Sequence, residues 1–400
     1  MSLIAPQPPS GARRYDLDWL RVILFGILVV HHAAVGFAAF GADIYGFAND
    51  KLGGEGLSLI IYFNHTWRLP ALFLIAGIGT YFATGRAMGP AFMGRRLVRL
   101  LVPVVFGFFI LNLFAGYAIA VRQGGGPAVE VIRDWWFNPE PRQVLHLWFL
   151  VNLSIYTLLS WPLFLLRSRL ERLVIHPAWL VVGVMSISTM IAALAKPYGS
   201  ALAGDGYQFP WYWSIFMAGY VLGAQHSSVL DWAARWWWAL LFAGFIGFTT
   251  EIGLLGWFIS RDLALGEAVA SGGWAVHGLW PAYSAPTLTF SIAEGLNAWF
   301  FSLTAAGLCA RFLNRPGALL DELSRATFPI YVLHFPVTIV LLAFLAVVPW
   351  PWGWELLILA VLTYGITAGL YLLADRSGFP LVLIGGRSRG AAVPSRKAEA

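Results

Sequence analysis

Apolar stretches of about 20 residues recur along nearly the whole chain, and short polar segments separate them. The apolar residues in each stretch are continuous and do not alternate with polar ones, so the pattern favours helices over the strands of a membrane barrel. Because a helix needs about 20 residues to cross the hydrocarbon core, the pattern predicts ten membrane spans. They cover residues 18–39, 63–84, 99–120, 144–166, 178–196, 208–225, 236–259, 287–310, 327–348 and 354–374.

The two ends of the chain differ from this middle part. Residues 1–12 contain several prolines and are expected to form a disordered tail, and residues 377–400 are expected to form a cytoplasmic tail. Residues 13–376 are expected to form one transmembrane domain. No internal repeat is evident there, which weakens an interpretation as a transporter built from inverted repeats.

The composition agrees with a chain that lies in lipid. Of the 400 residues, 59% are hydrophobic and only 12% are charged, whereas soluble domains carry roughly 25% charged residues. Because lipid offers the backbone no hydrogen bonds, helices are the spanning elements that fit continuous apolar stretches. The sequence therefore predicts an all-α, polytopic transmembrane helical bundle and excludes an ordinary soluble domain.

The net charge of +6 is better explained by membrane orientation than by a nucleic-acid partner. If the amino terminus is cytoplasmic, 19 of the 26 lysine and arginine residues fall in cytoplasmic segments, six fall in outer segments, and Arg68 lies within a span. This bias predicts ten spans with both termini in the cytoplasm. The single cysteine, Cys309, excludes an internal disulfide and a cysteine zinc cluster, and no metal is expected.

Ionisable residues inside the spans are the first candidates for chemistry, because each is costly in hydrocarbon. In the first span, Arg21 and His32 are 11 residues apart, which places them on one helix face with a rise of about 16 Å. Asp18 lies one turn before Arg21 and can pair with it. His31 points about 80° away from Arg21, so the shared face favours His32 as a proton acceptor. Interhelical hydrogen bonding by the two histidines is the structural alternative.

Arg68 is the candidate in the second span, where it is expected to enter the outer end of the helix. A buried guanidinium there can bind an anionic group or stabilise a developing oxyanion. The alternative is a side chain that extends to the outer surface.

A compact basic cluster follows the second span, at Arg95, Arg96 and Arg99. It can serve as an orientation signal of a cytoplasmic segment, or it can hold phosphate groups or a carboxylate.

Further polar and aromatic residues of the later spans are candidates for substrate binding or support. They are His146 and Trp148 in the fourth span, Glu251 in the seventh, Glu294 in the eighth, and Tyr331 and His334 in the ninth. The two glutamates can partner Arg68 or a histidine, and the spacing does not decide between these pairings. A packing or hydrogen-bonding role is the alternative for each of them.

Taken together, these motifs resemble the acyltransferase-3 family of integral membrane acyltransferases, in particular its glucan succinyltransferase branch. The resemblance covers most of residues 14–376, and the order and spacing of five motifs carry it. These motifs are Leu17-Asp18-Trp19-Leu20-Arg21 followed by His32; Trp67-Arg68-Leu69-Pro70 through Gly77; Arg95-Arg96 to Arg99 and Pro103; His146-Leu147-Trp148-Phe149-Leu150; and Phe328-Pro329-Ile330-Tyr331-Val332-Leu333-His334.

The resemblance implies transfer of an acyl group, of the acetyl or succinyl class, from cytoplasmic acyl-coenzyme A to a hydroxyl of an extracytoplasmic glycan or similar acceptor. It implies a location in the bacterial inner membrane, with acyl-coenzyme A as a substrate and no tightly bound cofactor. The family's functional arginine and histidine of the first helix fall on Arg21 and His32 here.

The resulting hypothesis makes His32 the general base, with Arg68 and Tyr331 as donors to the tetrahedral oxyanion. Arg21, Arg95, Arg96 and Arg99 would hold the phosphates of the donor. An acyl-histidine intermediate is a less favoured variant. Two other functions stay open from the residues: a transporter of a polar or acylated small molecule with Arg68 and Glu251 in its path, and a non-catalytic subunit of a surface-polysaccharide system.

Overall fold

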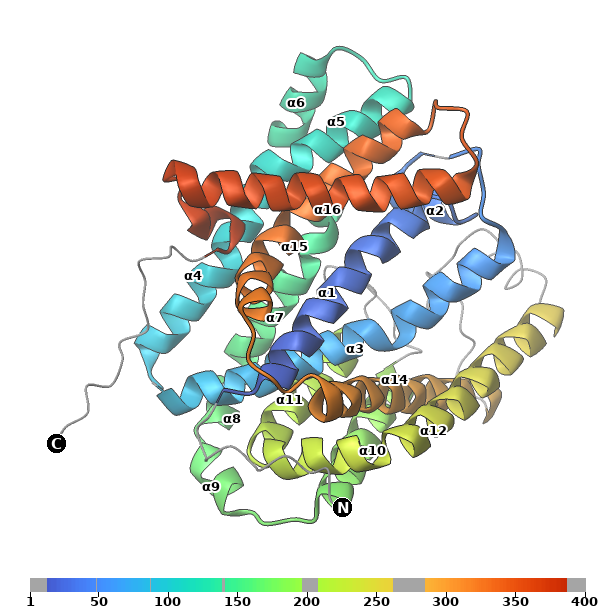
Figure 1. Ribbon diagram of the computed structural model, residues 1–400. Coiled ribbons are helices and arrows are strands. Elements are labelled where there is room, and N and C mark those ends of the chain that lie inside the picture. The colour runs from blue at the N-terminus through green and yellow to red at the C-terminus, as the bar shows by residue number, and fades with distance from the viewer. Residues whose placement is uncertain are drawn as a thin grey trace.

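The structure is a computed structural model that describes residues 13–47, 49–86, 88–138, 141–195, 208–261 and 285–386. Within these ranges the chain folds into helices joined by turns and short connections, without a strand. Figure 1 shows the helices assembled into a bundle, with the long helix α1 in its middle. The expected all-α class is therefore confirmed for the described part of the chain.

The first half of the bundle contains α1 (Tyr15–Val35), α2 (Gly41–Tyr45), α3 (Gly54–Arg86), α4 (Pro90–Phe106), the π-helical turn η1 (Gly107–Leu111), α5 (Asn112–Arg122), α6 (Ala128–Phe137), the 3₁₀ segment η2 (Pro141–Leu147), α7 (Trp148–Leu159), α8 (Trp161–Phe164) and α9 (Arg167–Arg172). The second half contains α10 (Pro177–Ala195), α11 (Gln208–Gly223), α12 (His226–Arg261), α14 (Ala285–Phe312), α15 (Ala318–Leu345), α16 (Trp352–Ser377) and η5 (Leu381–Ile384).

Every expected span coincides with helical structure, but not every such helix has the length and composition of a membrane span. Seven described segments do, namely α1, α3, the continuous α4–η1–α5, α10, α12, α15 and α16. At the other three expected spans, α7 and α11 are short, with 12 and 16 residues, and the 28-residue α14 does not meet the same criteria. These seven helices make the chain an integral membrane protein. The number of ten spans stays a prediction.

The first and last described residues lie at the same end of the bundle. Arg13 pairs with Asp321 at the start of α15, with 2.6 Å between the charged atoms. The segment η5 packs on α4 and on the start of α15, where Gly385 lies directly against the ring of Phe328. An even number of crossings returns a chain to its starting side, which agrees with this arrangement. That this side is cytoplasmic stays a prediction. The expected tail at 1–12 and residues 387–400 of the expected tail at 377–400 lie outside the described residues, whereas residues 377–386 end α16 and form η5 against the bundle.

Glycines allow α3 and α11 to pack in backbone contact. A Cβ atom on Gly77 would lie 2.0 Å from the carbonyl oxygen of Phe216, and one on Gly219 would lie 2.1 Å from that of Leu74. Real side chains cannot approach so closely, so only glycine fits at these two positions. The close contact fixes α3, which carries Arg68, against the core of the bundle.

The candidate residues converge where α1 crosses α3 and α15. Helix α1 packs against α3, α14, α15 and α16, and it occupies the middle of Figure 1. The segment η2 joins this region because its last residues contact α15. The histidines of four separate sequence segments are therefore brought together inside the bundle.

Candidate active site

A pair of histidines from α1 and α15 lies at the centre of the site. His32 Nδ1 and His334 Nε2 are 2.7 Å apart, which is hydrogen-bond distance. The two rings are nearly parallel, with 5.0 Å between their centroids and 6° between their planes. The tyrosine hydroxyl of Tyr45 donates to the backbone carbonyl of His32 and helps to fix the end of α1.

The hydrogen-bond partners of this pair determine where its protons lie. His334 Nδ1 is 2.6 Å from the carbonyl oxygen of Tyr331, and a carbonyl only accepts, so Nδ1 carries the proton in the neutral ring. Its Nε2 is then bare and accepts a hydrogen bond from His32 Nδ1–H. The Nε2 atom of a neutral His32 consequently keeps a lone pair that no described residue occupies, as a general base requires.

Exposure distinguishes His32 from the other histidines near it. His32 is half-buried, whereas His334 is fully buried and His31 and His146 are 7% and 6% exposed. A substrate can reach His32 more readily than its neighbours. Of the two adjacent histidines, this geometry therefore favours His32 over His31 as the proton acceptor.

His146 and Tyr331 support the pair from one side. The His146 ring lies 5.1 Å from that of His334, and its Nε2 is 3.1 Å from the carbonyl oxygen of Val332. The hydroxyl of Tyr331 donates to the carbonyl oxygen of His146 at 2.6 Å. This hydroxyl already donates its proton to a backbone carbonyl. Its hydrogen bonding therefore does not support the expected role of Tyr331 as an oxyanion donor.

The backbone just before His146 is strained. Leu145 has φ 48° and ψ −134°, and it is the one non-glycine residue with a positive φ among those that the structure describes. Such a conformation costs on the order of 1–3 kcal/mol and persists where the surroundings fix it. Here it turns the chain from η2 into α7 and places His146 against α15.

His31 belongs to a second group of side chains on the α3 side. Asn64 lies 3.2 Å from His31 Nδ1, and the ring of His65 stacks on that of His31 with 6.2 Å between centroids. The asparagine amide can donate to His31 Nδ1, which would leave the His31 proton on Nε2. His31 thus has the interhelical contacts of a supporting residue.

Arg68 is buried beside these histidines. Its side chain is 1% exposed, and its Nε and Nη1 atoms have no hydrogen-bond partner among the described residues. Arg68 follows His65 by three residues on α3, so it shares the helix face that carries the ring stacked on His31. Its charge is near enough to interact electrostatically with His32 and His334 as well. We call His32, His334, His146 and Arg68 the histidine centre.

The position of Arg68 corrects one expectation. Helix α3 begins at Gly54, well before the expected span at 63–84, so Arg68 lies deep within the helix and not at its outer end. Its burial contradicts the alternative that the side chain extends to the outer surface.

The two glutamates do not pair with Arg68 in an ion pair within the described chain. Glu251 is fully buried, and its two oxygens accept hydrogen bonds from the hydroxyl of Tyr62 and, at 2.7 Å, from the amide of Asn297. Asn297 also lies 3.3 Å from Thr66 Oγ1. We call Glu251, Tyr62, Asn297 and Thr66 the carboxylate network. Glu294, 7% exposed, lies close enough to act on Tyr62.

Arg21 lies near the end of the bundle where the described chain begins. It pairs with Asp18 at 3.1 Å, as expected from their spacing, and Asp18 also pairs with Arg13 at 2.7 Å. Helix α1 is continuous from Tyr15 to Val35, so the rise of about 16 Å between Arg21 and His32 holds. The two residues are therefore at different depths and do not touch.

The basic cluster of α4 divides into two kinds of residue. Arg95 and Arg99 are exposed, and the guanidinium of Arg99 lies 5.7 Å from the ring centre of Phe328. Arg96 turns into the bundle, where it donates to Thr157 at 2.9 Å and to Thr80 at 2.7 Å. Arg96 thus links α3, α4 and α7, a role that the spacing did not indicate.

Trp148 packs beside the site. Its ring lies 6.3 Å from that of Phe73 and 6.2 Å from that of Tyr212, and the Tyr212 hydroxyl is near enough to interact with Arg68. Trp148 therefore belongs to the aromatic packing behind the guanidinium.

Three polar neighbours of the histidines are not among the residues that the sequence indicates: Tyr45, Asn64 and His65. A signal was available for His65, because it precedes Arg68 by three residues and so shares its helix face. Tyr45 lies in the short α2, outside every expected span, and no periodicity points to it.

Comparison with known proteins now adds a family. The Acyl_transf_3 family model, described as an acyltransferase domain, matches residues 14–372. The chain belongs to the acyltransferase-3 family. No curated protein and no solved structure matches this acyltransferase.

The matched region contains all four elements that form the histidine centre of the acyltransferase, α1, α3, η2 and α15. A free imidazole lone pair beside a buried guanidinium is an arrangement that can accept a proton from a hydroxyl and stabilise a developing negative charge.

Proposed function

We propose that this membrane acyltransferase moves an acyl group of the acetyl or succinyl class from acyl-coenzyme A to a hydroxyl of an extracytoplasmic glycan or similar acceptor. The choice of donor, acceptor and acyl class follows from the resemblance to the glucan succinyltransferase branch. One observation carries the chemistry. His32 keeps the lone pair of Nε2 because its Nδ1–H donates to His334, and the nearby Arg68 has two nitrogens, Nε and Nη1, without a partner among the described residues.

In the proposed reaction His32 Nε2 takes the proton of the acceptor hydroxyl as the oxygen attacks the thioester carbonyl. The carbonyl oxygen becomes an oxyanion, and Arg68 stabilises it through Nε and Nη1. Collapse of this intermediate breaks the carbon–sulfur bond and forms the ester. The coenzyme A thiolate leaves and receives the proton from His32, so the enzyme returns to its starting state.

The donor would enter from the end of the bundle that holds Arg21. Arg21, Arg95, Arg96 and Arg99 remain the proposed phosphate ligands, and the bonds of Arg96 to two threonines make it the least available of them. The rise of about 16 Å from Arg21 to His32 is of the order of an extended pantetheine arm.

A row of aromatic rings connects this end to the histidine centre. Arg99 contacts Phe328, Phe328 stacks on Tyr331 at 6.1 Å, and the Tyr331 ring is 5.8 Å from that of His334. Phe25 of α1 lies 5.1 Å from Tyr331 on the facing side. We propose that the pantetheine arm runs along these rings.

The test uses full-length protein in lipid vesicles with a panel of labelled acyl-coenzyme A donors. Release of the free thiol and the mass of the acylated acceptor are measured for wild type, His32→Ala and His31→Ala. We expect loss of transfer in His32→Ala and a smaller loss in His31→Ala. His176→Ala, at an exposed histidine before α10, is the matched control.

Two outcomes would contradict the proposal. Wild-type transfer by well-folded His32→Ala would remove the base, and flux of an unmodified substrate that survives this substitution would favour the transporter hypothesis.

A further inference from the structure

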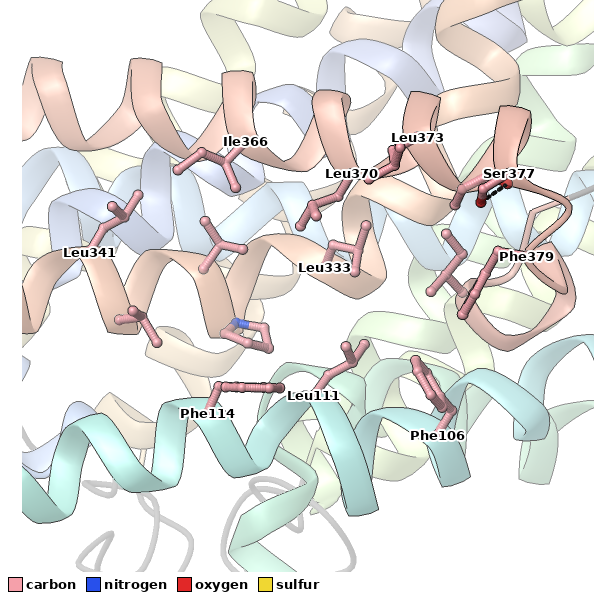
Figure 2. Close-up of a pocket in the computed structure, with 15 residues that line it drawn as sticks. Phe106, Leu111, Phe114, Leu333, Leu341, Ile366, Leu370, Leu373, Ser377 and Phe379 are labelled. Carbon is pink, nitrogen blue, oxygen red and sulfur yellow. Dashed lines mark hydrogen bonds between the residues drawn. The ribbon is translucent and has the colours of Figure 1, made fainter. Parts of the chain in front are cut away.

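An apolar groove lies on the opposite side of α15 from α1. It has a volume of about 540 Å³ and is formed by α4, α5, α15, α16 and η5 (Figure 2). Leu333, Pro336 and Ile384 are buried or half-buried and belong to its lining, whereas Phe114 and Leu373 at its edge are 60% and 64% exposed. Among the described residues that line it, Ser377 carries the only polar side chain.

The surroundings of the groove indicate what fills it. Its walls include α16 and the continuous α4–η1–α5, which are both long and apolar enough to cross the membrane. Their exposed apolar side chains therefore face hydrocarbon, and the groove opens to the same side. Because its described lining offers almost no polar partner, the groove suits a hydrocarbon chain.

The groove is long and follows the axis of α16. Figure 2 shows Ile366, Leu341 and Phe114 at one end and Ser377, Phe379 and Phe106 at the other. Ile366 and Ser377 are 11 residues apart on one helix, which corresponds to about 16 Å. An elongated shape of this length suits an extended acyl chain better than a compact ligand.

Two arginines lie near one end of the groove. Arg376 is exposed and directly precedes Ser377 in the last turn of α16, with Asp375 as the neighbouring acid. Arg99 is seven residues before Phe106, on the same face of α4, and so lies beyond the groove in the same direction. This arginine adds to the positive field, although we assign it to the donor.

We propose that this groove binds one acyl chain of an anionic phospholipid, with the lipid phosphate at Arg376. The binding does not depend on the proposed acyl transfer. Its consequence for the site is mechanical, because Leu333 and Pro336 flank His334 in the sequence of α15 and a bound chain would hold this part of the helix in place.

The test measures lipid bound to the purified full-length protein by native mass spectrometry. Phosphatidylglycerol is compared with phosphatidylcholine of the same chain length. We expect wild type to retain phosphatidylglycerol in preference, and Leu370→Trp, which fills the groove, to lose at least half of it. The matched control is Val361→Trp, because Val361 is 60% exposed on α16 but lies outside the groove. Leu373→Trp at the groove edge serves as a second variant if Leu370→Trp does not fold.

Two further measurements decide the details. Arg376→Gln is expected to reduce the preference for phosphatidylglycerol about fivefold, the effect of one basic residue at an anionic surface. A phospholipid with a photoreactive group in its acyl chain should label residues 366–377 and α5. Equal lipid retention by Leu370→Trp, Leu373→Trp and wild type would overturn the site, and equal binding of the two lipids to wild type would overturn the role of charge.

Discussion

The histidine centre and the carboxylate network are both buried polar groups, yet they differ in how fully their hydrogen bonds are made. Both oxygens of Glu251 accept a hydrogen bond from a neighbouring helix. In the histidine centre, two nitrogen atoms of Arg68 have no partner in the part of the chain that the structure describes, and His32 is only half-buried. The carboxylate of Glu251 is therefore satisfied within the protein, and Asn297 Oδ1 is the one buried atom of its network without a partner among the described residues. The histidine centre leaves several donors and a lone pair for another molecule.

One helix carries parts of both clusters, which makes the comparison direct. On α3, Tyr62 and Thr66 are four residues apart and belong to the carboxylate network, whereas His65 and Arg68 are three residues apart and lie at the histidines. An ionisable residue in a span is therefore not a sufficient sign of function. Whether its hydrogen bonds are satisfied separates a structural network from a site.

The largest contrast is expected at Arg68. We expect Arg68→Met to lower kcat about 10²–10³-fold, the usual cost of removing a donor to a developing oxyanion. The Tm should stay the same or rise, because an uncompensated buried charge costs free energy. Transfer rates and thermal unfolding in one detergent measure both. A lowered Tm with retained activity would make Arg68 structural and remove the contrast.

A smaller effect is expected at His334, which positions His32. We expect His334→Phe to lower kcat by about tenfold to 100-fold, less than the full contribution of a general base. KM for the donor should stay constant, because His334 touches no substrate in our proposal. His334→Gln should restore part of the activity, since its amide oxygen can accept from His32 Nδ1–H. Equal rates for the two variants would argue against this hydrogen bond as the positioning contact.

A substitution in the carboxylate network is expected to lower the stability of the protein and to change the rate of acyl transfer little. Glu251→Gln replaces one acceptor oxygen by a donor, so either Tyr62 or Asn297 loses its partner. Leaving a buried polar group unsatisfied costs about 1–3 kcal/mol, which should lower Tm by a few degrees. Activity per folded molecule should stay within about twofold. Glu322→Gln on the surface, where the side chain is 52% exposed, is the control. A large loss of rate at unchanged Tm would move Glu251 into the site.

The sequence predicts the helical class because continuous apolar stretches allow one solution in lipid. It also predicts that Arg21 and His32 share a face, since one continuous helix joins them. The span count is less secure, because α7 and α11 are shorter than a membrane crossing. Helix length within the membrane depends on packing against neighbouring helices, and the hydropathy of one segment carries no information about that packing.

Contacts between side chains of distant segments are the part of the site that the sequence does not predict. The His32–His334 contact joins residues 302 positions apart, and no local spacing encodes it. For the same reason Glu251 could not be assigned to Tyr62 instead of Arg68. The inward turn of Arg96 depends on Thr80 and Thr157 from two other helices.

The smallest effect is expected at Asp18, which tests whether the outlying arginines contribute at all. Asp18 pairs with both Arg13 and Arg21 while 20% exposed, and partly exposed pairs of this kind contribute about 0–1 kcal/mol to stability. Asp18→Asn should therefore change Tm little. If Arg21 holds a donor phosphate, removing the competing carboxylate should lower KM for acyl-coenzyme A, by less than about fivefold, and the gain should shrink at high salt. A KM that does not change at low salt would place Arg21 outside the donor site and confine the binding chemistry to the histidine centre.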